Sequence, residues 1–177
     1  MEKFLYLFVH KRKKYVAAEA ASIFADKQEP YIAANTNTHM IEVAFLEPYQ
    51  PSYANAISLL TSSKKGLNAK AAVDFLALSG FSPIEFQETF KTTVKTIQNY
   101  VTQGLSLDAA LSEKLLKSFA LFEKGIAVFG SAAAFHQWLN QAAYGLGNQF
   151  PFDMMDTITG INLIEEELIR LEYGDLA

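Results

Sequence analysis

Apolar residues recur every three or four positions through the C-terminal two thirds of the chain, which is the spacing of one helix face. The longest such stretch covers residues 107–129, with apolar positions at Leu111, Leu115, Phe119, Phe122, Ile126 and Phe129. A narrower seam near the C-terminus contains Ile161, Ile164, Leu168 and Leu171. No segment of residues 68–173 alternates apolar and polar residues as a half-buried strand does. The pattern predicts an all-α fold.

Start and stop signals divide this region into helices. Residues 70–78 place Ala72, Phe75 and Leu76 on one face and stop before Gly80, which suits a helix C-cap. Ser82, followed by Pro83 and by Glu85 three positions on, is a capping box. Further helices are expected at 94–103 (cap Thr93, stop Gly104, burying Val94, Ile97 and Val101), 107–129 (cap Ser106, stop Gly130), 132–140 (cap Ser131), from Pro151, and from about Gly160 to Tyr173.

The N-terminal third has a different pattern. Residues 29–65 contain three prolines and the polar run 62–66, which predict a linker. A helix is expected before it, over 17–25. We therefore divide the chain into an N-terminal arm and linker of unknown role (1–65), a helix-turn-helix region with a long connecting helix (66–130), and a C-terminal domain (131–177).

Composition narrows the class of protein. The chain has 177 residues, of which 50% are hydrophobic and 19% charged, so it can bury a core. It has no cysteine, which excludes disulfides, thiolate catalysis and cysteine metal sites. The apolar stretch 4–9 is too short for an export signal, and no run approaches the length that spans a membrane. We expect a cytoplasmic protein with no membrane partner.

Charge is unevenly distributed along the chain. The net charge is -4, and residues 131–177 carry seven acidic residues against the single basic Arg170. Phosphate contacts depend on cationic side chains, so nucleic acid would be repelled by this quarter of the chain. Any contact with DNA must come from the middle segment or from the basic cluster 11–14.

Residues suited to catalysis are scattered. His10, His39 and His136 lie in unrelated segments, without the spacing of a metal pair. The run 165–167 is three consecutive glutamates, which point about 100° apart on a helix and cannot converge on one atom, so we interpret them as a solvated face. The sequence predicts no catalytic residue, no metal and no cofactor.

Residues 82–103 form two short helices with a tight turn through 90–93, the spacing that a helix-turn-helix uses to place its second helix in a major groove. This spacing also occurs in helical bundles that bind no DNA. The candidate DNA-binding residues are Lys91, Thr93, Lys95, Thr96, Gln98 and Asn99.

The C-terminal half contains a more specific series of motifs. They are Val128-Phe129-Gly130, Trp138-Leu139, Leu146-Gly147, the run 151–157 (PFDMMDT) with Gly160, and Arg170-Leu171-Glu172-Tyr173-Gly174. In order and type they resemble the Xre/MbcA/ParS-type antitoxins, over roughly residues 66–177. Upstream, the run 95–98 (KTIQ) is similar to the start of that family's recognition helix. Where the family has a second glycine after Leu-Gly, this chain has Asn148.

The resemblance implies a function. In this family a toxin-binding domain follows a divergent helix-turn-helix of the Xre kind, the partner is a RES-type toxin that consumes NAD, and the antitoxin represses its own operon. The chain is then an antitoxin and not an enzyme, and a homodimer is expected because such repressors read two half-sites. The candidate toxin-binding residues are Trp138, Leu146, Gly147, Phe150, Met154, Arg170, Glu172, Tyr173 and Gly174.

Several alternatives stay open at this level. The apolar residues of 144–157 form either core, with Trp138, Leu146, Pro151 and Met155 as its members, or an exposed binding patch. The acidic last helix and tail could cover a cationic enzyme pocket in the partner. Two other functions fit the same residues: a protein-interaction module without DNA binding, and an orphan helix-turn-helix transcriptional regulator without a toxin.

Overall fold

The computed structural model describes residues 38 and 40–174. The chain divides into two compact units, Met1–Ala44 and Phe45–Ala177. Of the first, residues 38 and 40–44 are described and are helical. The expected helix 17–25, the basic cluster 11–14, His10 and His39 lie outside the described residues. All contacts discussed below are within the second unit.

Helix α8 (Ala109–Phe129) is the central element of this unit. It begins at Asp108, whose carboxylate accepts a hydrogen bond from the Leu111 amide (2.8 Å), so the predicted cap Ser106 is wrong. Ser106 instead pairs with Asn68 in an isolated β-bridge. The predicted apolar stripe is confirmed in its central part, where Leu115, Phe119, Phe122 and Ile126 are buried.

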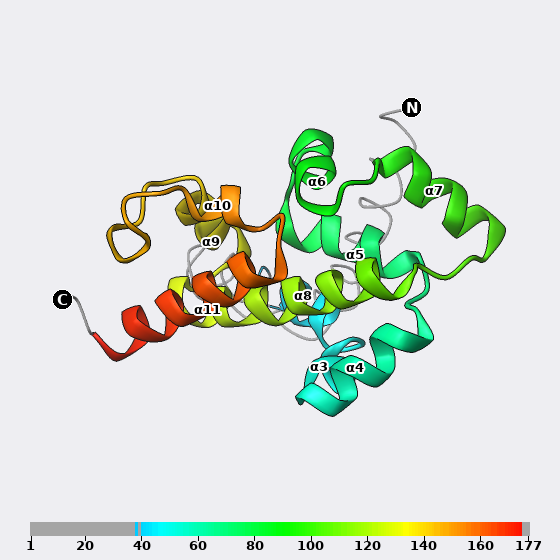
Figure 1. Cartoon of the computed structure of the whole chain (residues 1–177), viewed down its shortest axis with the longest axis horizontal. Coiled ribbons are helices and arrows are strands. Elements are labelled where there is room, and N and C mark those ends of the chain that lie inside the picture. The colour runs from blue at the N-terminus through cyan, green and yellow to red at the C-terminus, as the bar shows by residue number, and fades with distance from the viewer. Residues whose placement is uncertain (1–37, 39, 175–177) are drawn as a thin grey trace, which may run out of the picture. The chain divides into compact units, whose positions relative to one another are not determined.

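Helices α3 (Gln50–Tyr53) and α4 (Ala56–Lys65) lie where we predicted a linker, so that prediction is wrong for these residues. Pro51 stands in the first turn of α3, where a proline costs no hydrogen bond. Asn55 caps α4 through its side chain. Figure 1 shows both helices on one side of α8, with α5 and α6 on the other.

Helices α5 (Lys70–Ser79), α6 (Pro83–Phe90) and α7 (Val94–Gln103) confirm the predicted signals. Gly80 and Gly104 end α5 and α7 in the left-handed conformation, and the capping box of α6 is complete. The predicted burial on α7 is only partly right. Ile97 is buried, Val94 is half-buried and Val101 is exposed, because α7 faces the rest of the unit through a narrow strip.

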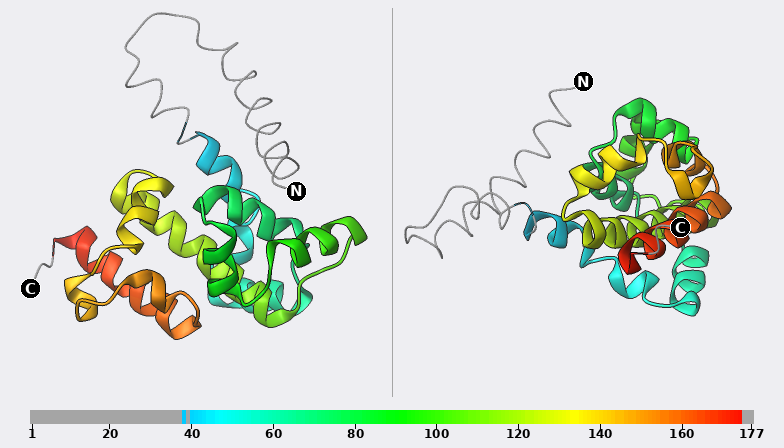
Figure 2. Two further views of the ribbon diagram at one scale, coloured as in Figure 1. Left: turned by 90° about the horizontal axis from the view of Figure 1, so that it is seen from above. Right: turned by 90° about the vertical axis from the view of Figure 1, so that its left-hand side faces the viewer.

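The C-terminal elements are α9 (Ala132–Leu139), the 3₁₀ turn η1 (Tyr144–Leu146), α10 (Pro151–Met154) and α11 (Ile158–Tyr173). Helix α11 starts two residues earlier than predicted because Thr157 caps it, accepting a hydrogen bond from the Gly160 amide (3.0 Å). The views of Figure 2 show α11 running along α8.

Aromatic rings join these elements into one core. Phe75 of α5 is fully buried and makes edge-to-face contacts with Phe119 and Phe122 of α8, both at 5.2 Å between ring centroids. Phe122 also contacts Phe135 of α9 at 4.9 Å. Such pairs add roughly 0.5–1.5 kcal/mol each beyond the area they bury. The core is thus continuous from α5 through α8 to α9.

Within the described residues, no single helix is long and apolar enough to cross a membrane. Only α8 and α9 taken together pass that test of length and composition, and they are bent by 101° at the break between them.

Candidate protein-binding site

Helix α11 has one face toward the core and one toward solvent. Ile161, Ile164 and Leu168 are buried, as the sequence predicted. The opposite side, which we call the outer face of α11, consists of Leu163, Glu166, Ile169, Arg170 and Tyr173. Leu163 and Ile169 are 43% and 41% exposed and Tyr173 is 80% exposed. A helix at the surface of a monomer normally presents polar residues there, so the outer face is suited to contact another protein.

The loop between α9 and α10 presents two more exposed aromatic residues, Tyr144 (78% exposed) and Phe150 (50%). An isolated β-bridge between Ala143 and Gln149 closes its base. Gly147 and Asn148 both adopt positive φ (68° and 60°), and asparagine is the residue that tolerates this conformation best after glycine. Asn148 therefore replaces the family's second glycine without requiring a different turn.

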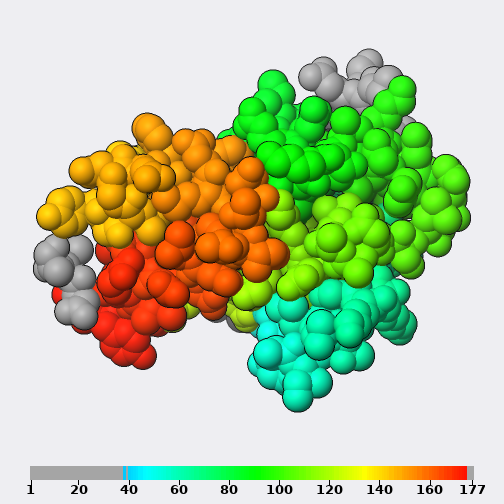
Figure 3. All heavy atoms as spheres, viewed as in Figure 1, coloured from blue at the N-terminus to red at the C-terminus, as the bar shows by residue number. Residues whose placement is uncertain are grey.

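The loop lies directly against α11, and Figure 3 shows the two side by side on one face. A side chain at Gly145 would run into the Glu167 carboxylate, which accepts a hydrogen bond from Arg170 Nε (2.8 Å). Glu167 is buried, so our interpretation of residues 165–167 as a solvated face is wrong for this residue. Its carboxylate lies against the loop at Gly145. In the sequence it is marked only by its place on the buried seam, one residue before Leu168.

The linking segment from α10 to α11 is equally close-packed. Any side chain at Gly160 would collide with the Met154 backbone. The missing side chain of Gly160 therefore permits close contact between α10 and α11. Met154 itself is half-buried, while Pro151 and Met155 are buried, as predicted for core residues.

Trp138 belongs to an aromatic stack on α9. Its ring lies 5.3 Å from that of Phe129 and 5.9 Å from that of Phe135, and the side chain is half-buried. The expected core member Leu146 is buried (8% exposed). The apolar residues of 144–157 thus divide between core and surface, with Tyr144 and Phe150 outside.

Two polar contacts hold α11 to α8. Lys117 Nζ donates to Asn162 Oδ1 (2.7 Å), and Lys124 forms an ion pair with Glu172. Glu172 is therefore engaged within the chain rather than free to meet a partner. Gly174 ends α11 in the left-handed conformation, and Asp175 lies outside the described residues.

The candidate DNA-binding residues lie at the α6–α7 corner, by which we mean residues 83–103. Lys95 and Asn99 are exposed on α7, and Gln98 is half-buried. Thr93 caps α7, and its hydroxyl is 3.0 Å from that of Thr96. Lys91 adopts positive φ (54°) at the end of α6 and pairs with Asp156 at 3.2 Å. The structure thus brings these residues together at one corner, with Lys91 turned toward the C-terminal region.

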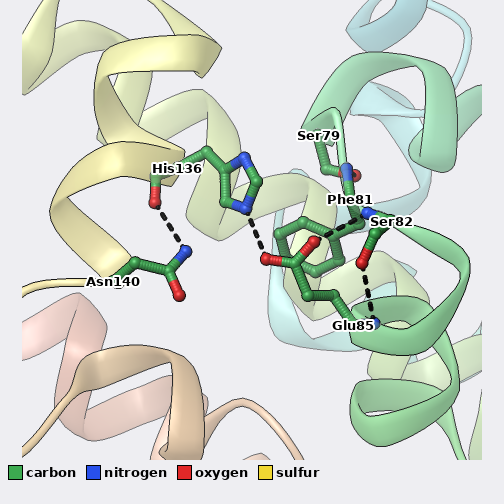
Figure 4. A network of polar contacts seen from close by, with 6 residues as sticks. All are labelled: Ser79, Phe81, Ser82, Glu85, His136 and Asn140. Atoms are coloured by element: carbon green, nitrogen blue, oxygen red, sulfur yellow. Dashed lines mark hydrogen bonds and ion pairs between the residues drawn. The ribbon is translucent and has the colours of Figure 1, made fainter.

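A second set of polar contacts connects α6 with α9, as Figure 4 shows. Glu85 Oε2 accepts from the Ser82 amide (2.7 Å), and Glu85 Oε1 is 2.9 Å from His136 Nε2. Burial alone would raise the pKa of Glu85, but the hydrogen bonds from Ser82 and His136 outweigh it, so the pKa is lowered. The sequence identified the capping box but gave no indication of its histidine partner.

At the other end of α6, Lys114 of α8 reaches between two segments. Its Nζ donates to the Thr89 carbonyl (2.9 Å) and to the Asp156 carbonyl. Burial lowers the pKa of this ammonium, and Lys91 adds to that effect while Asp156 opposes it. Two carbonyl acceptors compensate the partial loss of water around the charge.

The described residues contain no group of three or more metal-ligating side chains. What the C-terminal region offers instead is a compact helical domain with exposed aromatic and aliphatic residues on α11 and the neighbouring loop. Fold and surface together define an all-helical protein-interaction domain. Residues 124–174 match the family model of the antitoxin Xre/MbcA/ParS C-terminal toxin-binding domain.

The resemblance predicted from the sequence is thus confirmed over residues 124–174, the toxin-binding segment. The match supports an antitoxin of a toxin–antitoxin system, with a toxin as partner. No curated protein matches the chain at a significant level.

Proposed function

We propose that this chain neutralises a RES-type, NAD-consuming toxin by binding it directly, and that it represses its own operon through the α6–α7 corner. It acts in the cytoplasm as a homodimer, without metal, cofactor or catalysis of its own. The observation that carries the proposal is the match of residues 124–174 to a toxin-binding domain. The division into residues 1–65, 66–130 and 131–177 belongs to the same proposal.

The outer face of α11 and the loop side chains Tyr144 and Phe150 supply the contact surface. Tyrosine and arginine are enriched among residues that dominate binding energy, and Tyr173 and Arg170 are both exposed here. Of the other candidate residues, Trp138, Leu146 and Met154 act from beneath by supporting the loop and α11. Gly147 and Gly174 set the turns, and Glu172 fixes α11 to α8.

Replacement of Ile169 by Asp tests this surface. A charge in the centre of a protein interface costs several kcal/mol when it is left unpaired. We therefore expect cells that make the RES-type toxin together with the Ile169→Asp chain to lose NAD and stop growing. With the original chain they retain both.

The matched control is Ile57→Asp. Ile57 is 78% exposed on α4, far along the chain from the matched domain, so the same substitution there should leave neutralisation intact. Both variants are exposed changes and should keep the helical circular dichroism spectrum. If the folded Ile169→Asp variant still protects the cells fully, the outer face of α11 is not part of the contact surface. If cells with the unmodified chain are still poisoned, the chain does not neutralise the RES-type toxin.

A second function, a protein-interaction module without DNA binding, is favoured by one observation. Among the four exposed or half-exposed polar candidates on α7, only Lys95 is cationic, and Lys91 beside it is paired with Asp156. Phosphate contacts need cations, so such a surface gives little affinity for DNA.

A further inference from the structure

Helix α6 is held at both of its ends by residues of the C-terminal domain. It has eight residues, too few to be stable without tertiary contacts. At its N-terminus the Glu85 carboxylate uses one oxygen for the capping box and the other for His136 of α9. Both side chains of this pair are 23% exposed, so the contact is largely shielded from water.

The residue before the cap reinforces the same end. Phe81 is buried (5% exposed), with its ring 5.2 Å from that of His136 and 5.4 Å from that of Phe152 in α10. His136 and Phe152 both lie within the matched domain. The start of α6 is therefore positioned by side chains of α9 and α10.

The C-terminal end of α6 is joined to Asp156 of the C-terminal domain, directly through Lys91 and also through Lys114 of α8, which lies outside that domain. Lys114 donates to the Thr89 carbonyl at the end of α6 and to the Asp156 carbonyl just before α11. The Asp156 carboxylate pairs with Lys91, the residue that ends α6. Two residues, Thr92 and Thr93, then lead into α7, so the end of α6 is one determinant of the orientation of α7, beside its packing on α5.

We propose that the C-terminal domain controls the order of the α6–α7 corner by holding both ends of α6. Helix α7 has Ile97 as its one buried residue and packs on α5 and α6, so the end of α6 supplies part of what positions it. Loosening either end of α6 then raises the population of a state in which the corner is open. Whatever binds the C-terminal domain and shifts α9 or residue 156 changes the way α7 is presented.

The proposal concerns the free chain and does not rest on the proposed function. It is tested by hydrogen exchange of the full-length protein, followed by mass spectrometry of peptides covering residues 83–103. His136→Ala removes the hydrogen bond to a carboxylate, so exchange in these peptides should become roughly tenfold faster. Gln137→Ala, an exposed change one residue along α9, should leave exchange unaltered.

The second end has its own matched pair. Lys114→Met removes the donor to Thr89 and Asp156, and should accelerate exchange in the same peptides. Lys117→Met is the same change on the same helix, but Lys117 bonds to α11 and not to α6. It should therefore leave residues 83–103 as they are.

His136→Ala could also destabilise the whole protein, so two further variants separate a local effect on α6 from global destabilisation. His136→Gln retains an amide donor toward Glu85 and should restore slow exchange. In a Glu85→Ala background, His136→Ala should accelerate exchange at the corner less than it does in the original chain, because only the ring contact with Phe81 is left to lose. The proposal is overturned if residues 83–103 exchange alike in the His136, Gln137, Lys114 and Lys117 variants, or if His136→Gln is as fast as His136→Ala.

Discussion

The Glu85 carboxylate joins two parts of the protein, because its two oxygens have different partners. One oxygen completes a local capping box that the sequence predicts from spacing alone. The other contacts His136, which is fifty-one residues away along the chain. The local contact was predictable and the distant one was not, because no pattern near His136 records what packs against it.

The pairing of Glu85 has a consequence for acid stability. Its pKa lies below the ordinary value of 4.5, so the folded state favours the ionised carboxylate. The resulting stabilisation is fully present above that pH and is lost as the pH falls through the lowered pKa. We expect Glu85→Gln to lose less stability on acidification than the original chain, by about 1 kcal/mol.

Urea unfolding at about pH 6 and about pH 3.5 measures this difference, on either side of the carboxyl range. Glu88→Gln is the control, the same substitution at an exposed glutamate on the same helix. An equal loss for Glu85→Gln and the original chain would show that the carboxylate contributes nothing in the folded state.

At the scale of whole elements, helices with a complete cap and a continuous apolar face were predictable. Residues 94–103 were located to the residue because Thr93 and Gly104 mark their ends, and Ser82 fixed the start of α6, whose last residue Phe90 was expected in the turn. Helix α4 was missed because its serines and lysines are typical of a loop. It is a helix because Asn55 caps it and it packs on α8, with Ser63 as its buried residue, and a linear pattern cannot show that contact.

The junction that ends α4 can be tested with a pair of glycines. Gly66 has φ 81° and ψ 132°, and a Cβ there would lie 2.6 Å from the Leu107 carbonyl oxygen. Gly104 has φ 66° with nothing within 4 Å of the corresponding position. Alanine at either position is strained by the positive φ, but only at position 66 does its Cβ also collide with the backbone.

We expect Gly66→Ala to lower the free energy of unfolding by about 2 kcal/mol more than Gly104→Ala. Urea denaturation of the two variants gives the comparison directly. If both variants lose the same free energy of unfolding, α4 can shift away from residue 107 without cost. Helix α4 would then be less firmly packed on α8 than the structure indicates.

On the scale of the whole molecule, charge decides how much DNA affinity the α6–α7 corner can supply. The net charge is -4, and the acidic excess lies in the last quarter of the chain. That quarter of the chain thus repels a polyanion, while α7 lies in the middle segment outside it. Few cations then take part, so the dependence of binding on salt should be shallow, because its slope scales with the number of phosphates neutralised.

Lys95→Ala and Gln98→Ala together should abolish a shift of the DNA upstream of this gene in an electrophoretic assay. Helicity should be unaffected, since Lys95 is exposed and Gln98 half-exposed on α7. Replacement of Lys124 by Ala is the control, a loss of the same charge at a site bonded to Glu172 and away from the corner. A retained shift in the double variant would assign DNA contact to another surface.

The family match begins at residue 124, inside α8, which starts at Ala109. Phe122, just before that point, packs its ring on Phe135 beyond it. Exchanging toxin specificity between relatives by grafting the matched segment therefore cuts through a continuous helix and an aromatic pair. A working chimaera must transplant α8 whole, together with the residues of α4 and α5 that enclose it.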